Sequence, residues 1–298
     1  MTLEMVIVLA VMGLLAYLPG MRLIGSFRED YIPMAPSTAI GFLVLAATQL
    51  LLLRRKPAQA TAFLIIVLVA LVSAFGLIVF LDLVVDFPFD IETIFFPFAE
   101  TEDGMPVGRM SPATGLLFFF SGIVAICLSN LRSKAKSPVL VDYAGGVLGV
   151  AVLLISFAFW LAYFYGDPLL YGYDIVPMAL TTSLGFLFLS LSFLTNDKAT
   201  FPIRILMGGS TQSYILRFIL PLTIFSVLFG GLIFLCFRHV ILIPPALVSA
   251  TITLLMTLTA VWVSAWMSRV MGNDIESSQK ETQIANEILH DMKTIAES

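Results

Sequence analysis

Eight long apolar runs fill most of this chain, and they constrain its fold more than any other feature of the sequence. Charged residues interrupt the runs only near their ends. About 20 apolar residues in a helix cross the roughly 30 Å hydrocarbon core of a bilayer. Hydrophobic residues make up 59% of the 298 residues and charged residues 12%. A water-soluble fold could not bury that much apolar surface.

The sequence therefore predicts an all-α integral membrane protein with about eight transmembrane helices. The expected spans lie near residues 3–18, 37–53, 61–85, 113–130, 139–165, 179–195, 215–236 and 246–267. Together they form a membrane domain over residues 1–268, followed by a cytoplasmic segment over residues 269–298. Glu4 precedes the first run, where a signal peptide would carry Lys or Arg, so we expect this run to stay as a helix.

Basic residues set the expected orientation, because cytoplasmic loops are enriched in Lys and Arg. One side of an eight-helix arrangement holds twelve of them: Arg54, Arg55, Lys56, Arg132, Lys134, Lys136, Lys198, Arg204, Arg217, Arg269, Lys280 and Lys293. The other side holds four basic residues and ten acidic ones, Glu92 among them. We expect both termini in the cytoplasm and the protein in a bacterial inner (cytoplasmic) membrane.

A short motif recurs before the second, fourth, sixth and eighth runs. The copies are Pro33 to Ala39, Arg109 to Gly115, Pro177 to Ser183, and a weaker one from Pro244 to Ala250. Their aligned hydroxyl residues, Thr38, Thr114, Thr182 and Ser249, are 76, 68 and 67 residues apart. Each interval holds two helices with their loops. Four copies in register indicate four parallel helix-pair repeats.

Helix-start chemistry explains the motif locally. Ser111 suits an N-cap, and Pro36 and Pro112 suit the first helical turn. A Thr two residues after each proline can bond an exposed backbone group. Each single copy is explained by this alone, including those with Pro177 and Pro244. Parallel repeats also differ from the inverted repeats of many secondary transporters, which lowers the expectation of transport.

The sequence contains few residues that could form a catalytic, metal or haem site within the expected spans. Asp82 and Asp142 are expected near span ends, and Gln49 is the one other strongly polar residue at depth. Cys127 and Cys236 fit buried small hydrophobes better than a metal site. His239 and His290 cannot face each other across helices as haem ligands. We expect no cofactor, no metal and no nucleic-acid partner.

Two outer segments combine aromatic and acidic residues, from Asp86 to Arg109 and from Trp160 to Asp174. Aromatic belts at the membrane interface explain both. A ligand-binding lid is the alternative for the first segment. The sequence leaves both interpretations open.

The segment from 269 to 298 is polar, and its apolar residues follow alternating steps of four and three, as in a coiled coil. We expect a cytoplasmic signalling helix that supports a homodimer. His290 is followed by an acid and then a base, which resembles the phosphoacceptor box of sensor histidine kinases, although Ile295 stands where that box has proline. His290 is thus a candidate phosphoacceptor, with an exposed surface histidine as the simpler alternative.

Two stretches resemble a known module. Gly108 to Thr114 after the outer segment, and Tyr165 to Gly172 leading to Val176 to Leu180, look like the N-terminal multi-spanning module of bacterial sensor proteins. In that family the module precedes PAS, histidine-kinase or diguanylate-cyclase domains. The resemblance covers roughly residues 15–275. It implies a signal-input domain, with no ligand and no binding residue to carry over.

The sequence thus predicts a non-catalytic input module that relays an extracytoplasmic or intramembrane stimulus through the last span. Its expected partners are the lipid bilayer, a second copy of the chain, and a cytoplasmic output domain in cis or a response regulator in trans. Such a parent protein could be a sensor histidine kinase, but this chain lacks a complete catalytic domain. A small-molecule transporter or channel built from parallel repeats is the alternative. A membrane-embedded enzyme finds no support in the pattern of reactive residues.

Overall fold

The computed structural model describes residues 1–28, 31–54, 58–85, 92, 100–102, 105–133, 139–166, 169 and 176–195, and positions 213, 217, 219, 221, 224, 228 and 230. The chain divides into two units, Met1–Gly208 and Gly209–Ser298. All helices and strands named below belong to the first unit. The expected spans near 215–236 and 246–267 and the segment 269–298 lie outside the continuously described ranges.

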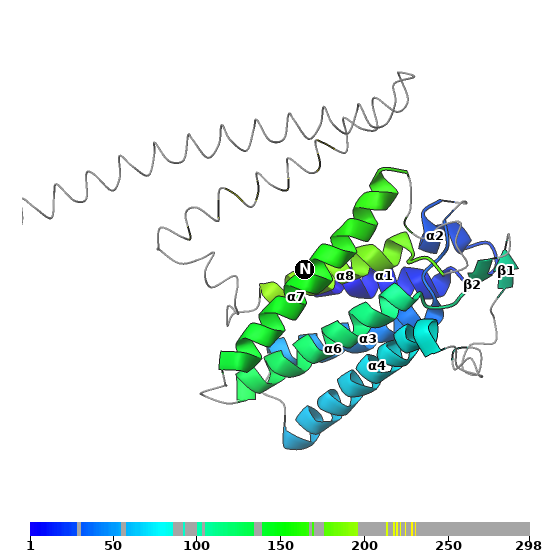
Figure 1. Ribbon diagram of the computed structural model, residues 1–298. Helices are drawn as coiled ribbons and strands as arrows, with labels where there is room; N and C mark the ends of the chain where they lie inside the picture. Colours follow the sequence, from blue (N-terminus) through cyan, green and yellow to red (C-terminus); the bar gives the residue numbers. More distant parts are fainter. Residues whose placement is uncertain are drawn as a thin grey trace, which may run out of the picture. The chain divides into compact units, whose positions relative to one another are not determined.

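Apolar helices dominate the first unit (Figure 1). They are α1 (Thr2–Leu15), the short α2 (Arg22–Ser26), α3 (Pro36–Arg54), α4 (Gln59–Val85), α6 (Pro112–Ser133), α7 (Val139–Phe164) and α8 (Leu180–Leu194). Strands β1 (Glu100–Glu102) and β2 (Met105–Val107) form an antiparallel hairpin before α6. In the described ranges, α3, α4, α6 and α7 are long and apolar enough to cross a membrane.

The first helix is shorter than the apolar run suggested. It ends at Leu15 rather than near residue 18, and its 14 residues rise roughly 21 Å. Proline disfavours helical backbone at the residue before it, here Leu18, and Gly20 adopts a positive φ of 78° that favours glycine. The chain then turns into α2, where Gly25 lies directly against Ala16.

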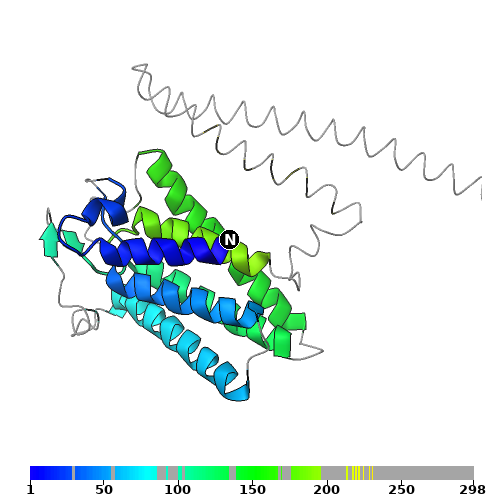
Figure 2. The same cartoon turned by 180° about the vertical axis from the view of Figure 1, so that it is seen from behind.

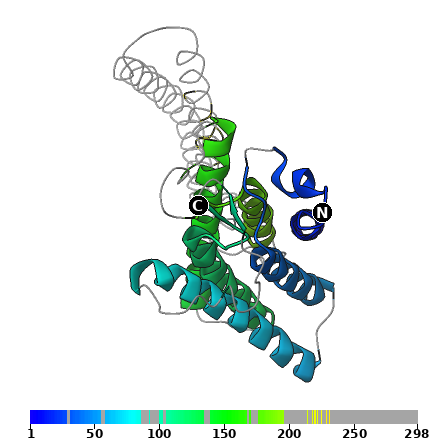
Figure 3. The same ribbon diagram turned by 90° about the vertical axis from the view of Figure 1, so that its right-hand side faces the viewer.

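The helices form three pairs around a common centre. Within the pairs, α1 packs on α3, α4 on α6 and α7 on α8, and between the pairs α6 packs on α7 and α1 on α8 about as extensively. The second helix of each pair lies inside: 61% of the apolar window is buried in α3 and α6, against 22% in α4 and α7. From behind, α1, α3 and α4 lie side by side (Figure 2). The view turned by 90° shows α4 at the edge (Figure 3).

Three aromatic rings fill the place where the inner helices meet. Phe42 of α3, Phe118 of α6 and Phe186 of α8 contact one another, with centroid distances of 5.1, 4.6 and 4.9 Å. Each of the three side chains is at most 1% exposed. Tilted and edge-to-face ring pairs each add about 0.5–1.5 kcal/mol beyond burial. The rings therefore link the three inner helices directly.

The helix-start motifs place these rings in register. Each phenylalanine follows the aligned hydroxyl, Thr38, Thr114 or Thr182, by four residues in the chain. A buried methionine precedes each hydroxyl by four residues: Met34, Met110 and Met178. The hydroxyl residue and the phenylalanine lie on one face of each helix, because residues four apart share a face, whereas each methionine lies just before its helix. The three copies thus present the same face towards the centre.

Small residues let α4 and α6 approach closely. A Cβ on Gly76 would lie 2.5 Å from the Gly115 carbonyl oxygen, and one on Gly122 would lie 2.5 Å from Ser73 Cβ. The Ser73 hydroxyl donates to the Phe119 carbonyl at 3.0 Å. Small-residue contacts and interhelical hydrogen bonds of this kind drive helix association in membranes.

Candidate functional site

A buried polar cluster lies at the end of the bundle where α3, α6 and α8 begin, here called the Glu92 end. Seven hydroxyl side chains from the three helix-start motifs are at most 7% exposed, namely Ser37, Thr38, Ser111, Thr114, Thr181, Thr182 and Ser183. Polar groups are costly to bury without hydrogen bonds. The hydrogen-bond partners of these hydroxyl groups therefore show which segments the cluster connects.

Glu92 is the centre of this cluster, and it is only 6% exposed. Its Oε1 accepts a hydrogen bond from the Ser37 hydroxyl in the first turn of α3. The Met110 backbone N–H, just before α6, donates to Oε1 at 2.9 Å and to Oε2 at 2.8 Å. One carboxylate thus joins the first two helix-start motifs. Hydrogen bonds to a charged group are worth about 1.5–3 kcal/mol each.

Tyr17 lies just beyond the end of α1, within electrostatic range of Glu92. Burial raises the pKa of the Tyr17 hydroxyl, the nearby negative charge of Glu92 raises it further, and Arg22 acts in the opposite direction. The hydroxyl therefore stays neutral. It has no hydrogen-bond partner among the described residues. A buried donor without a partner is unusual in native proteins, where nearly all such groups are paired.

The second motif also caps its own helix. The Ser111 Oγ accepts a hydrogen bond from the Thr114 backbone N–H at 3.1 Å, as expected of an N-cap. Pro36 and Pro112 are the first residues of α3 and α6, again as expected. Thr114 differs from the expectation, because its hydroxyl contacts the Ser111 hydroxyl at 2.8 Å rather than a backbone group.

The third motif is anchored by other partners. The Tyr163 hydroxyl, from the end of α7, donates to the Met178 carbonyl at 2.6 Å. The Thr181 hydroxyl donates to the Gly25 carbonyl of α2 at 3.2 Å. Tyr31 packs edge-on against Tyr163, with ring centroids 4.9 Å apart. Pro177 lies in the extended segment before α8 rather than in its first turn.

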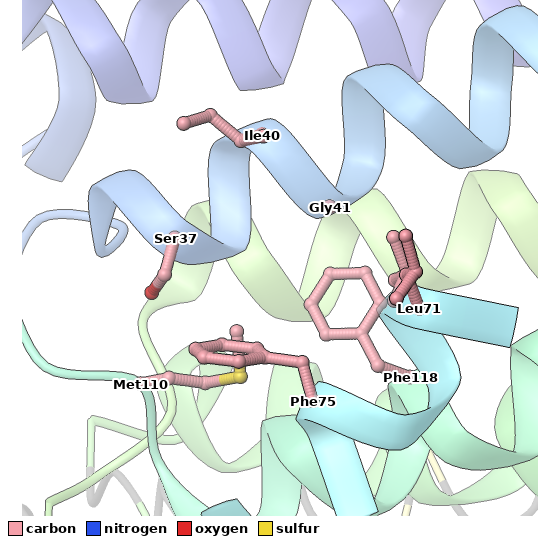
Figure 4. A pocket seen from close by; sticks show the side chains of 8 residues that line it. Ser37, Ile40, Gly41, Leu71, Phe75, Met110 and Phe118 are labelled. Atoms are coloured by element: carbon pink, nitrogen blue, oxygen red, sulfur yellow. The ribbon is translucent and has the colours of Figure 1, made fainter. Parts of the chain in front are cut away.

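An apolar cavity of about 260 Å³ adjoins Glu92, between α3, α4 and α6 (Figure 4). Its eight lining residues are Ser37, Ile40, Gly41, Leu71, Val72, Phe75, Met110 and Phe118. Two of these, Ser37 and Met110, are the residues that donate to Glu92. Small-molecule sites combine mainly apolar walls with a few placed polar groups. The cavity and the carboxylate therefore form one candidate binding site.

The other residues singled out from the sequence do not join this site. Asp82 is exposed near the end of α4, and Asp142 lies in the first turn of α7. Gln49 is 3% exposed, and its Nε2 has no partner in the described part of the chain. No group of three or more His, Cys, Asp or Glu side chains that could hold a metal occurs within the described ranges. Pro244, Ser249 and His290 lie outside them.

Sequence reasoning missed the role of Glu92, which it treated as one acid of an outer aromatic segment. No local signal identifies it, because its partners are 55 and 18 residues away in the chain. The contact among Phe42, Phe118 and Phe186, here called the aromatic centre, was also missed, although the spacing of the motifs contained a signal for it. Extending the aligned motifs by four residues would have revealed Phe42, Phe118 and Phe186.

Comparisons with known proteins add no family to this description. No family model, curated protein or solved structure matches the chain.

Proposed function

We propose that this chain is a signal-input module of a membrane protein. A stimulus at the Glu92 end changes the packing of the inner helices, and the change passes through the expected last span to the segment 269–298. The single observation that carries this proposal is the position of Glu92. The carboxylate holds the starts of α3 and α6 together beside a cavity. An occupant of that cavity would touch both of its hydrogen-bond donors.

The aromatic centre supports the relay step. A shift of α3 relative to α6 must repack Phe42 against Phe118, and both rings contact Phe186. Packed interiors respond to such shifts by switching between discrete arrangements. A stimulus can drive the switch only if it binds one arrangement more tightly than the other. The cavity beside Glu92 provides a place for that difference to arise.

The proposal includes the finer architecture expected from the sequence. It comprises eight spans in four parallel pairs, both termini in the cytoplasm of a bacterial inner membrane, and a homodimer joined through the segment 269–298. The output is a histidine kinase or diguanylate cyclase in cis, or a response regulator in trans, with His290 as a candidate phosphoacceptor. The shared Met, Thr and Phe register of three helix-start motifs supports the repeat.

Transport is the less supported function. The rings of Phe42, Phe118 and Phe186 occupy the centre of the described bundle, where a polar pathway between the inner helices would have to run. The cavity is apolar and lies to one side of that centre. Neither observation favours a channel along the axis.

A chimera tests the proposal. The full chain is fused at Ser298 to a diguanylate-cyclase core, reconstituted in liposomes, and its cyclic-dinucleotide synthesis is measured. Glu92→Gln removes the charge that joins α3 to α6, and we expect it to change basal output roughly tenfold, equivalent to about 1.4 kcal/mol. Glu4→Gln, at an exposed carboxylate on α1, is the matched control and should leave output unchanged. Equal output from both variants and the parent would contradict the relay.

A further inference from the structure

The cavity beside Glu92 has a side opening and one polar end. Ile40 and Leu71, at its rim, are 43% and 61% exposed. α4 packs extensively on α6 but only lightly on α3, which leaves the gap between α3 and α4. The exposed residues around the opening are apolar, so a molecule arriving by this route comes from the hydrocarbon of a bilayer.

The walls select a hydrocarbon chain. Phe75, Phe118 and the Met110 thioether lie on one side of the cavity, and α3 with Ile40 and Gly41 lies on the other (Figure 4). The absence of a side chain at Gly41 lets the Phe118 ring lie within van der Waals distance of the α3 backbone. A volume of about 260 Å³ is close to the lower limit of roughly 300 Å³ for small-molecule sites. It suits one chain segment, with the remainder extending into the bilayer.

The polar end selects a hydrogen-bond donor. Among the described lining residues Ser37 supplies the one polar side chain, and its proton is already donated to Glu92. A hydroxyl that donates its proton presents only lone pairs to a ligand. An ionised fatty acid, which can only accept, therefore fits poorly, whereas a fatty alcohol donates to the Ser37 oxygen.

We infer that the cavity binds a single-chain, hydroxyl-headed membrane amphiphile, with its hydroxyl at Ser37 and its chain leaving between α3 and α4. This inference rests on the proposed function in one respect only, which is that the bound amphiphile serves as the stimulus. Occupancy places a new donor next to the Ser37–Glu92 hydrogen bond. The ligand thereby acts on the contact that joins α3 to α6.

Photolabelling tests the binding directly. The purified full chain in nanodiscs is labelled with a dodecanol analogue that carries a diazirine on its chain, and labelled peptides are mapped by mass spectrometry. We expect labels in residues 37–41, 71–75 and 110–118, and competition by dodecanol but not by dodecanoate. Equal competition by dodecanoate would overturn the choice of head group. Label spread evenly over all exposed apolar helix faces would overturn the site.

Two matched variants sharpen the result. Leu71→Trp narrows the cavity, and Leu64→Trp alters a similarly exposed leucine seven residues away on the same face of α4. We expect labelling to fall roughly tenfold in the first, equivalent to about 1.4 kcal/mol, and to be unchanged in the second. Equal labelling in the two variants would overturn the proposal. Val72→Phe, at the next position of α4, also fills part of the cavity and replaces Leu71→Trp if thermal unfolding shows that variant to be misfolded.

Ser37→Ala removes the head-group contact together with the Ser37–Glu92 hydrogen bond, so a hydrocarbon without a hydroxyl serves as the control ligand. We expect the substitution to weaken competition by dodecanol about fivefold, the effect of losing one hydrogen bond, while competition by dodecane stays the same. An unchanged dodecanol competition would overturn the assigned contact. These measurements need no output domain. Site-specific labelling together with a cyclase chimera that ignores dodecanol would contradict the proposed function and leave the binding site intact.

Discussion

At the scale of single residues, Glu92 joins two helix starts that lie far apart in the chain. It is buried, and its acceptor oxygens satisfy a backbone N–H and a hydroxyl from two different helix starts. The Tyr17 hydroxyl keeps its proton, because burial and the charge of Glu92 raise its pKa. The carboxylate therefore holds two helix starts together, and in the proposed function it is also the point of control.

Replacing Glu92 with alanine should destabilise the protein by about 3 kcal/mol, because the Met110 N–H and the Ser37 hydroxyl lose their charged acceptor. The unfolding free energy is measured by denaturant titration in detergent micelles. Glu92→Gln keeps one acceptor oxygen and should cost about half as much. Glu4→Ala, at an exposed carboxylate with 64% side-chain exposure, is the control. A Glu92→Ala protein as stable as this control would refute the assigned role.

At the scale of helices, the close packing of α4 on α6 depends on glycine and serine positions rather than on large apolar side chains. Gly76, Gly115 and Gly122 with Ser73 let the two backbones approach until an added methyl group would collide. Most of the remaining surface of α4 is exposed and apolar. The contact with α6 therefore holds α4 in place and sets one wall of the cavity.

Gly122→Ala should destabilise the bundle by about 1–3 kcal/mol, since its methyl group would lie 2.5 Å from Ser73 Cβ. Gly149→Ala is the matched control within α7, because its added Cβ meets Leu194 at an ordinary 3.4 Å. The control gains helix propensity worth about 1 kcal/mol. Thermal unfolding of both proteins in the same detergent makes the comparison. Similar melting temperatures would show that close packing of α4 on α6 is not required.

At the scale of the whole molecule, the distribution of basic residues predicts which end of the helix bundle faces the cytoplasm. The Glu92 end carries β1 and β2 before α6, whereas the opposite end is where α6 finishes at Ser133. Arg54 at the end of α3 and Arg132 in the last turn of α6, two of the basic residues expected in the cytoplasm, lie at that opposite end. We therefore expect the Glu92 end to face away from the cytoplasm.

Cysteine labelling in intact cells tests this orientation. After Cys127 and Cys236 are replaced by alanine, a cysteine at Thr101 in β1 should react with a membrane-impermeant maleimide. A cysteine at Ser133 should react only after the membrane is permeabilised. The readout is the gel shift of a polyethylene-glycol maleimide. The reverse pattern would place the Glu92 end in the cytoplasm and exclude an extracytoplasmic stimulus at this site.

The sequence by itself determined the local features of this protein. Apolar runs predicted helices that α3, α4, α6, α7 and α8 now occupy, because a helix satisfies its own backbone in an apolar environment. Pro36, Pro112 and Ser111 predicted where α3 and α6 begin, because capping involves only residues close in the chain. The four-residue step to the central phenylalanines was also present in the sequence.

Only the tertiary structure decided what these elements do together. The burial of Glu92 depends on Ser37 and Met110, which lie far from it in the chain. The cavity exists because α4 closes on α6 through glycines and leaves a gap at α3. Such features follow from packing between distant segments, and apolar patterning does not encode that packing. The candidate site is therefore a property of the assembled bundle.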